Sequence, residues 1–354
     1  MTVAVIFGGK SSEHTVSIAT GFMTIKALEK NFDVLPVYVD AQGVMKSVGK
    51  CRDVTLKKLK KGKVVRFRSG TPCFFVGTKT FNISCAVLCM HGMNGEDGVM
   101  QGFLKSLNIP FSGSGVLASA VGLDKDFMKS RFKSENIPTL DYVSIKNGES
   151  EQEIFDKLQK IGYPLILKPA RLGSSIGIGI ASCKEEAEEK IQNAFKYDDK
   201  VVVERALKNF REVNCAILKR CDEFIISHIE EPVRSEEILS YKDKYCYGAK
   251  SAIRKIPACL EKETAEKIKE LALKTFRAIE CAGVARVDFI IDEEGEVWVN
   301  EINTIPGSLA HYLFAPLGLN AKDVCSFLIE DAKWEKEREG RVSYEYEDGV
   351  IAGK

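Results

Sequence analysis

A short apolar run that stops at two glycines restricts the fold of this chain more than any other feature. Residues 3–7 are apolar, Gly8 and Gly9 follow, and apolar side chains then recur at near-helical spacing from Val16 to Ala27. A second apolar run covers residues 34–39. Strand, glycine turn, helix and strand in this order are typical of a βαβ unit with parallel strands. The sequence therefore predicts an α/β fold with a parallel sheet near its N-terminus.

The composition limits the class of protein and its partners. The chain has 354 residues, of which 45% are apolar, so two or three domains with buried cores are expected. Its 51 basic and 50 acidic residues leave a net charge of +1, which gives no electrostatic reason to expect a nucleic acid or an anionic membrane. No apolar run approaches the roughly 18 residues that a membrane-spanning helix needs. We therefore expect a small molecule as partner.

Cysteine usage indicates the compartment. The eleven cysteines are odd in number and contain no Cys-x-x-Cys pair, so neither a disulfide framework nor a thiolate zinc site is predicted. No basic leader precedes the first strand. We therefore expect reduced thiols in a soluble, cytoplasmic protein.

Several later segments predict further elements. Residues 86–90 form a buried-type strand that ends in the polar, glycine-rich segment 91–98, and ligands bind at such strand ends in open sheets. Near Leu123 the pattern becomes helical, which indicates a new domain. The basic run within residues 57–63 is expected to be a solvated face or a hairpin. Residues 232–257 have no clear period and predict a long mobile loop.

A hairpin near the C-terminus predicts a metal site. Apolar alternation gives strands at 284–291 and 296–302 with a turn at 292–295. Glu301 and Asn303 share one face because side chains alternate along a strand, and an unbulged four-residue turn puts Asp288 on that face too. Two carboxylates and an amide are hard oxygen ligands that suit magnesium beside nucleotide phosphates. The alternative is a solvent-exposed acidic hairpin, which the apolar residues between them disfavour.

A lysine supplies the positive charge that phosphates need. Lys168 ends an apolar strand at 164–169, immediately before a glycine- and serine-rich loop at 173–179. A lysine in this position can reach phosphates while loop amides cover the remaining oxygens. A Walker A loop is rejected at Lys10, because Ala4 stands where its first glycine is required. A dinucleotide site at 113–118 is the weakest alternative, since a poor strand precedes it.

Taken together, the motifs resemble those of a known family over nearly the whole chain. They occur in the same order as in the D-alanine:D-alanine ligases of the ATP-grasp superfamily. The matching segments are Gly8-Gly9-Lys10-Ser11-Ser12-Glu13-His14-Thr15-Val16-Ser17, His91-Gly92, Gly95-Glu96-Asp97-Gly98, Gln101-Gly102, Lys168-Pro169, Gly173-Ser174-Ser175, Gly177, Arg286-x-Asp288, Asn300-Glu301-Ile302-Asn303-Thr304 and Pro306-Gly307. Several matches in the right order are far more specific than any one of them.

The resemblance implies an α/β (α+β) fold with a three-domain ATP-grasp architecture. We expect an N-terminal Rossmann-like, parallel-sheet substrate domain at 1–122, a central ATP-grasp subdomain at 123–211, and a C-terminal ATP-grasp subdomain with the metal and catalytic residues at 212–354. ATP would lie between the second and third domains and phosphorylate the carboxylate of one D-alanine. The amine of a second amino acid would then expel phosphate, which makes the protein an ATP-dependent ligase for peptidoglycan precursors.

The resemblance also implies roles for individual residues. Contacts with ATP are expected from Lys125, Lys168, Glu204, Leu207, Glu212 and Lys244. Two magnesium ions, with manganese as an alternative, would be held by Asp288, Glu301 and Asn303. Glu13 matches the residue that holds the first ammonium group, Ser174 and Tyr245 match its loop partners, and His91 lies near the first substrate. Arg286 and the backbone of Gly307 would form an oxyanion hole.

One segment departs from the family pattern and affects the second substrate. The family usually has a serine here that helps to hold the acceptor carboxylate, but this position is Tyr312, followed by Leu313. A ligase with D-serine as acceptor is therefore an alternative, and the sequence leaves the second amino acid open. Retention of Tyr245 favours an amine acceptor over a hydroxy acid. A non-catalytic nucleotide-binding protein of the same fold is the alternative from another class, and a homodimer is expected by analogy.

Overall fold

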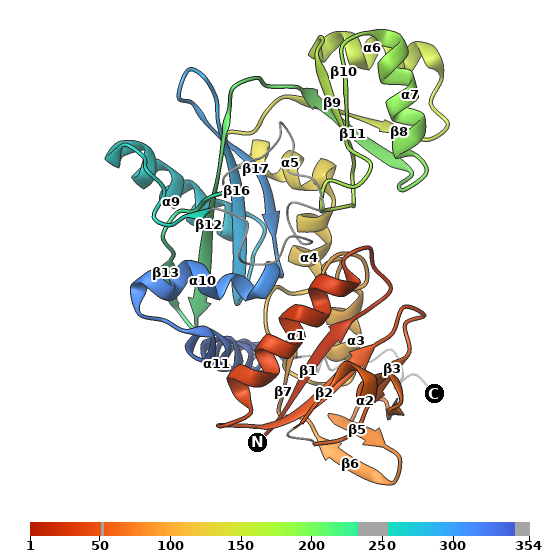
Figure 1. Ribbon diagram of the computed structural model, residues 1–354, viewed down its shortest axis with the longest axis vertical. Coiled ribbons are helices and arrows are strands. Elements are labelled where there is room, and N and C mark those ends of the chain that lie inside the picture. The colour runs from red at the N-terminus through yellow and green to blue at the C-terminus, as the bar shows by residue number, and fades with distance from the viewer. Residues whose placement is uncertain (51–52, 233–253, 344–354) are drawn as a thin grey trace, which may run out of the picture.

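The structure is a computed structural model that describes residues 1–50, 53–232 and 254–343. Three sheets follow one another along the long axis of the molecule, with the N-terminal sheet at one end (Figure 1). No helix within the described ranges is both long enough and apolar enough to cross a membrane.

The N-terminal sheet has seven strands in the order β6-β5-β4-β3-β2-β1-β7. Its strands are β1 (Thr2–Gly8), β2 (Asp33–Val39), β3 (Met45–Ser47), β4 (Lys63–Phe67), β5 (Cys73–Val76), β6 (Lys79–Asn82) and β7 (Cys85–Leu88). Strand β1 is parallel to both β2 and β7, and α1 (His14–Leu28) connects β1 to β2. The predicted βαβ unit is confirmed. The other neighbours are antiparallel, so the sheet is parallel only at the edge formed by β2, β1 and β7.

The turn between β1 and α1 requires glycine. Gly8 has φ of +96°, and a Cβ there would lie 2.1 Å from the carbonyl oxygen of Val39 on the neighbouring strand. Gly9 donates from its backbone nitrogen to the same oxygen at 2.8 Å. A side chain at Gly8 would disrupt this contact, so only glycine fits there. The tight turn brings the start of α1 close to the end of β2. The basic run, by contrast, is exposed and includes the short helix α2 (Leu56–Lys60), so it is a solvated face and not a hairpin.

The second sheet is antiparallel, with the order β10-β9-β11-β8. Its strands are β8 (Tyr142–Lys146), β9 (Leu165–Pro169), β10 (Gly179–Ala181) and β11 (Lys200–Arg205), and its helices are α6 (Glu151–Ile161) and α7 (Lys184–Ala194). Helices α3 (Val99–Ser106), α4 (Val116–Leu123) and α5 (Lys125–Ser134) connect it to the N-terminal sheet.

The third sheet is also antiparallel, with the order β13-β12-β16-β17. Its strands are β12 (Arg211–Arg220), β13 (Glu223–Ile226), β16 (Val284–Ile291) and β17 (Val297–Asn303), and α9 (Lys262–Ala278) packs against it. A separate pair joins β14 (Glu231–Pro232) to β15 (Arg254–Lys255). The chain continues through η1 (Gly307–Ala310), α10 (His311–Phe314) and η2 (Ala315–Leu317) to α11 (Ala321–Glu339).

The hydrophobic cores are not built from three consecutive stretches of the chain. The core of the N-terminal sheet also contains Val324 and Leu328 of α11, and α11 contacts α1 directly (Figure 1). Met128 and Phe132 of α5 belong to the core of the third sheet. The second sheet has a core of its own. The domain limits at 122/123 and 211/212 stay predictions.

Candidate active site

The predicted hairpin is present, but its register differs from the predicted one. Strand β16 ends at Ile291 and β17 begins at Val297, so the connecting loop is one residue longer than expected. That loop alone would put Asp288 opposite Asn300, but a bulge next to Asp288 makes it pair with Glu301 instead. The prediction of an unbulged turn is therefore wrong. The prediction that Asp288 and Glu301 share one face is confirmed. They share it because the extra residue in the bulge compensates for the extra residue in the loop.

Arg286 is held as a fixed cation on this face of the hairpin. Its Nε donates to Asp288 Oδ1 at 2.6 Å and its Nη2 donates to Asp288 Oδ2 at 2.8 Å. Burial disfavours the charged guanidinium, but Asp288 outweighs burial and raises the pKa of Arg286 well above its usual value. Asn303 pairs with Arg286 across the hairpin and donates from Nδ2 to Asp288 Oδ2 at 3.2 Å. The predicted hairpin residues thus converge.

The donor set of the hairpin fits a hard divalent cation. The carboxylates of Asp288 and Glu301 stand opposite each other, and the side-chain amide of Asn303 reaches the same carboxylate of Asp288. An amide can turn to present its oxygen in place of its nitrogen. No group of three His, Cys, Asp or Glu side chains in the described ranges could hold a metal, so a metal here would depend on the amide and on substrate oxygens.

Two lysines from outside the hairpin face it. Lys168 on β9 donates from Nζ to Glu204 Oε2 at 2.9 Å and to Asn300 Oδ1 at 3.2 Å. Lys125, at the start of α5, has its Nζ 3.6 Å from Glu301 Oε2. Asn300 is the residue that the bulge adds to β17, and its side-chain oxygen accepts from Lys168. Two of the predicted ATP-binding lysines therefore lie beside the predicted metal ligands.

Lys129 is a member of this charge network that the sequence did not reveal. It is 1% exposed, its Nζ lies 3.1 Å from Glu204 Oε1, and it donates to Thr139 Oγ1 at 2.8 Å. Burial would raise the pKa of Glu204, but Lys129 and Lys168 outweigh it and lower this pKa to about 2. Burial also lowers the pKa of Lys129, and Glu204 opposes that shift. The only sequence signal was that Lys125 and Lys129 are one helical turn apart.

Glu13 and Ser174 meet on the N-terminal side of the site. Both are buried, and Ser174 Oγ donates to Glu13 Oε1. Ser174 and Ser175 have φ of 57° and 59°, a left-handed backbone that non-glycine residues rarely adopt. The glycine- and serine-rich loop is therefore bent so that its first serine reaches the start of α1, and the predicted neighbourhood of Glu13 and Ser174 is confirmed.

His91 takes part in a chain of hydrogen bonds between three segments. Its Nδ1 donates to the carbonyl oxygen of Ile305 at 2.7 Å, because a carbonyl can only accept. Its Nε2 lies 2.8 Å from Thr20 Oγ1, which accepts from the backbone nitrogen of Ser308 at 3.1 Å. Burial lowers the pKa of His91, so the ring is neutral and Nε2 accepts the proton of Thr20. Thr20 was not among the predicted residues.

Glu96 joins the same segments on the other side. Its Oε2 accepts from the backbone nitrogen of Gly92 at 2.8 Å, and its Oε1 accepts from the backbone nitrogen of Ile305 at 2.9 Å. Burial, together with the charge of Glu13, raises the pKa of Glu96 to about 8. Its place in a sequence motif did not indicate this linking role.

Tyr312 lies in a second polar cluster. Its Oη donates to Glu230 Oε2 at 3.1 Å, and the guanidinium of Arg254 is 4.7 Å from the centroid of its ring. Burial raises the pKa of Tyr312, and Glu230 adds to that shift. Leu313 points elsewhere: it is fully buried in the core of the N-terminal sheet, so its side chain offers a ligand no surface.

The remaining predicted residues are less well defined. Leu207 and Glu212 are half-buried near the connection from β11 to β12, and Gly307 begins η1. Lys244 and Tyr245 lie outside the described residues, as does most of the segment predicted as a long loop. Ser308, Leu309 and Ala310 all have φ near 50°, so the backbone that follows Gly307 is strained.

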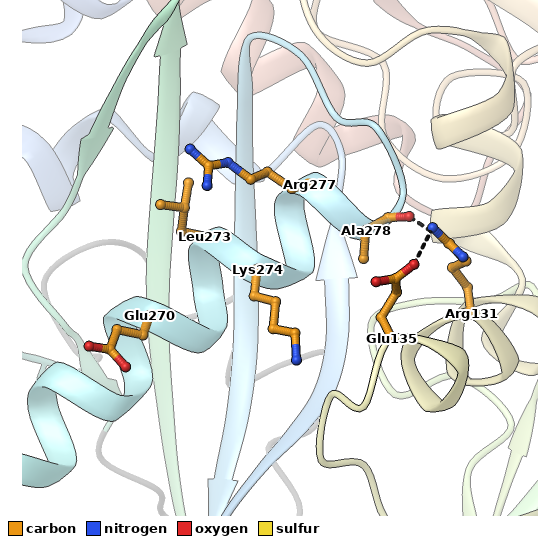
Figure 2. Close-up of a pocket in the computed structure, with 7 residues that line it drawn as sticks. All are labelled: Arg131, Glu135, Glu270, Leu273, Lys274, Arg277 and Ala278. Carbon is orange, nitrogen blue, oxygen red and sulfur yellow. Dashed lines mark hydrogen bonds and ion pairs between the residues drawn. The ribbon is translucent and has the colours of Figure 1, made fainter.

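A surface groove elsewhere does not coincide with the site. It lies between α5 and α9 and is lined by Arg131, Glu135, Glu270, Leu273, Lys274, Arg277 and Ala278 (Figure 2). Arg131 closes one end, donating from Nε to the carbonyl oxygen of Ala278 at 2.8 Å while Nη2 pairs with Glu135. None of its lining residues is a predicted site residue.

Two family models match the chain. The model for the D-ala D-ala ligase N-terminus matches residues 2–114, and the model for the D-ala D-ala ligase C-terminus matches residues 132–330. The second match contains the glycine- and serine-rich loop, the hairpin and the segment of Tyr312. The first contains Glu13 and His91.

Similar proteins match over nearly their full length. A D-alanine--D-alanine ligase of Thermosipho africanus is 34% identical over 343 residues, which are 94% of this chain and 93% of the relative. One from Prochlorococcus marinus is 37% identical over 348 residues, 94% of this chain and 98% of the relative. Among solved structures, the D-alanine-D-alanine ligase from Coxiella burnetii has a TM-score of 0.85 at 25% identity and 96% coverage of both chains. The VanG D-Ala:D-Ser ligase from Enterococcus faecalis has a TM-score of 0.80 at 30% identity, covering 94% of this chain and 99% of that one.

Proposed function

This chain belongs to the D-alanine:D-alanine ligase family, and on that premise we propose that it joins two D-alanine molecules for peptidoglycan precursors. It is an ATP-dependent ligase that forms a C–N bond and has the ATP-grasp fold. The observation that carries the proposal is the convergence of Arg286 and the hairpin carboxylates with Lys125 and Lys168. The named relatives favour D-alanine as acceptor over D-serine, and they give no support to a non-catalytic binder.

The reaction has two steps because a carboxylate is a poor electrophile. One carboxylate oxygen of the first D-alanine attacks the γ-phosphorus of ATP, the bond to the bridging oxygen breaks, and ADP leaves. The amine nitrogen of the second D-alanine then bonds to the acyl carbon and loses a proton. The C–O bond to the phosphoryl group breaks in the same step, which releases phosphate and leaves the dipeptide.

The charged residues would support the first step. Lys125 and Lys168 would compensate the phosphate charge of ATP, to which an ammonium group is well suited. The family uses ATP with a divalent metal, and Asp288, Glu301 and Asn303 would hold that metal here. A bound divalent cation neutralises phosphate oxygens and the charge that develops as the phosphoryl group moves. Two magnesium ions, with manganese as a substitute, are part of the proposal.

The residues around Glu13 would support the second step. Glu13 would bind the ammonium group of the first D-alanine, and the neutral ring of His91 would lie beside that substrate without adding charge. Arg286 and the backbone nitrogen of Gly307 would stabilise the oxyanion that forms when the amine attacks. Preorganised donors of this kind lower the barrier most in a site that excludes water.

The proposal also covers the cellular compartment and the oligomeric state. The nine described cysteines are free thiols, which supports a reducing compartment such as the cytoplasm. A homodimer and the three domain ranges given above complete the proposal.

The test is a direct assay of the purified protein. With ATP, magnesium and D-alanine, we expect phosphate release and a product with the mass of D-alanyl-D-alanine. An Arg286→Met variant should release phosphate at least about 100-fold more slowly, because it lacks the oxyanion contact. No phosphate release by the unaltered protein would refute the proposal. Product that forms only after D-serine is added would assign a different acceptor.

A further inference from the structure

The cluster around Tyr312 has no role in the mechanism above, although it is built around a buried carboxylate. Glu230 is only 2% exposed, and it accepts from Tyr312 Oη at 3.1 Å and from Asn214 Nδ2 at 3.2 Å through the same oxygen, Oε2. Its other oxygen, Oε1, lies 3.2 Å from Arg254 Nη1. A buried carboxylate is retained only where it is well paired, so Glu230 serves to hold these groups in position.

The backbone around the cluster is also fixed. Asn214 and Glu230 exchange both backbone hydrogen bonds, at 2.8 and 2.9 Å. Strand β14 continues from there and pairs with β15, so that Pro232 stands opposite Arg254. The guanidinium of Arg254 therefore has three constraints: the strand pair, the carboxylate of Glu230 and the ring of Tyr312.

The cluster adjoins the reacting centre. Asn214, which donates to Glu230, stands opposite Asp288 across β12 and β16, and Asp288 in turn holds Arg286. Tyr312 is also five residues beyond Gly307, on the short helix α10 that follows η1. Asp288 has Asn214 on its β12 side and Glu301, which faces Lys125, on its β17 side. Arg254 is thus a second cation on the side of Asp288 away from Lys125.

Exposure separates Arg254 from the other cations of the site. The side chains of Lys125 and Lys168 are 10% and 9% exposed and face Glu301 and Glu204. Arg286 is 21% exposed and spends two donors on Asp288. The side chain of Arg254 is 41% exposed, and the described residues engage its Nη1 and one face of its guanidinium. An arginine has five donors in a fork that matches a carboxylate, so this one can bind a further anion.

We propose that Arg254 binds the carboxylate of the acceptor amino acid, while Glu230 and Tyr312 hold its guanidinium in place. The inference deepens the proposed function and rests on it, since only the second substrate needs its carboxylate bound on this side. The acceptor class is then a small α-amino acid whose amine faces the acyl phosphate beside Arg286. Tyr312 would replace, with Arg254, the contact that a serine makes in the family pattern.

The experiment separates the acceptor from the first half of the reaction. Hydroxylamine is a nucleophile without a carboxylate, so it captures the D-alanyl phosphate as a hydroxamate independently of any acceptor-binding arginine. Both products, hydroxamate and dipeptide, are measured for the unaltered protein, Arg254→Ala and Arg254→Lys. Lys255→Ala is the matched control, because it removes an exposed positive charge from the same strand.

Arg254→Ala should raise the acceptor KM by about 10- to 100-fold, the effect of losing hydrogen bonds to a charged group. Its hydroxamate rate should stay within about twofold of the unaltered protein, Arg254→Lys should recover part of the acceptor affinity, and Lys255→Ala should change neither. An unchanged acceptor KM, or a parallel loss of hydroxamate and dipeptide, would overturn the role of Arg254 and leave the proposed function standing. If the unaltered protein forms neither product, the proposed function fails, and the inference fails with it.

Discussion

The buried pair of Lys129 and Glu204 gives the sharpest prediction about stability. Lys129 is 1% exposed and Glu204 is fully buried, so neither charge is compensated by water. Replacement of Lys129 by methionine keeps a flexible side chain of similar length but leaves Glu204 with Lys168 as its one remaining cation among the described residues. The carboxylate then remains buried and only partly neutralised, which is costly for the folded state.

The size of the effect can be worked from the pKa of Glu204. The net decrease from 4.5 to about 2 corresponds to about 3 kcal/mol, which Lys129 and Lys168 together supply beyond the opposing effect of burial. Breaking a buried pair from one side usually costs roughly 3–5 kcal/mol, because the remaining charge lacks both partner and solvent. We therefore expect Lys129→Met to lower the free energy of unfolding at pH 7 by about 3 kcal/mol.

The assay is a double-mutant cycle in urea at pH 7, with Lys129→Met, Glu204→Gln and the double variant. The double variant should be more stable than the sum of the single effects predicts, by about 2 kcal/mol, since it removes both buried charges. Additive effects would refute the reasoning. The pH dependence is a second check: the stability from Glu204 is present above pH 4.5 and is lost as the pH falls toward about 2. In Lys129→Met the pKa of Glu204 in the folded protein is lowered less, so this loss should be smaller and should be complete at a higher pH.

Three further predictions concern groups that join separate segments. Thr20→Val should lower kcat for dipeptide formation about tenfold, because it removes the acceptor of the Ser308 N–H, whereas Thr20→Ser should be nearly normal; equal effects would contradict this. The pKa of Glu96 is raised to about 8, so this side chain stays protonated in the folded protein over a pH range in which it is ionised in the unfolded chain. The free energy of unfolding should therefore fall as the pH rises from about 4.5 to 8, and in urea titrations Glu96→Gln should lack that part of the pH dependence. Asp331→Ala should lower the free energy of unfolding by about 3–5 kcal/mol in the same titrations, since it strips buried Lys219 of one partner; a loss below about 1 kcal/mol would contradict it.

The hairpin shows what side-chain alternation predicted correctly and what it missed. Alternation placed the two carboxylates on one face, and the structure has them there. The assumed turn was nevertheless one residue too short, and the result was right only because a bulge compensates for it. The prediction overlooked the phase shift that the bulge causes: the buried apolar residues Val297 and Val299 are two positions apart, but Val299 and Ile302 are three apart. Asn300 was missed as a site residue for the same reason.

Contacts between distant segments explain most other omissions. Lys129 pairs with a residue 75 positions away, and Tyr312 with one 82 positions away, so no local spacing could indicate either. Motif order did bring Glu13 and Ser174 together, because the resemblance carried their long-range relation with it. The strained backbone after Gly307 had no signal either, since Ser308 to Ala310 are ordinary residues for a helix.

The packing of α11 has a consequence for how the chain is made. The core of the first sheet includes Val324, Leu328 and Ala332, more than 200 residues after the last strand of that sheet at Leu88. A ribosome delivers the N-terminal strands first, but the helix that covers them is synthesised only after both later sheets. The first sheet therefore waits with part of its apolar surface uncovered while the two later sheets are synthesised, and its core closes only when α11 has left the exit tunnel.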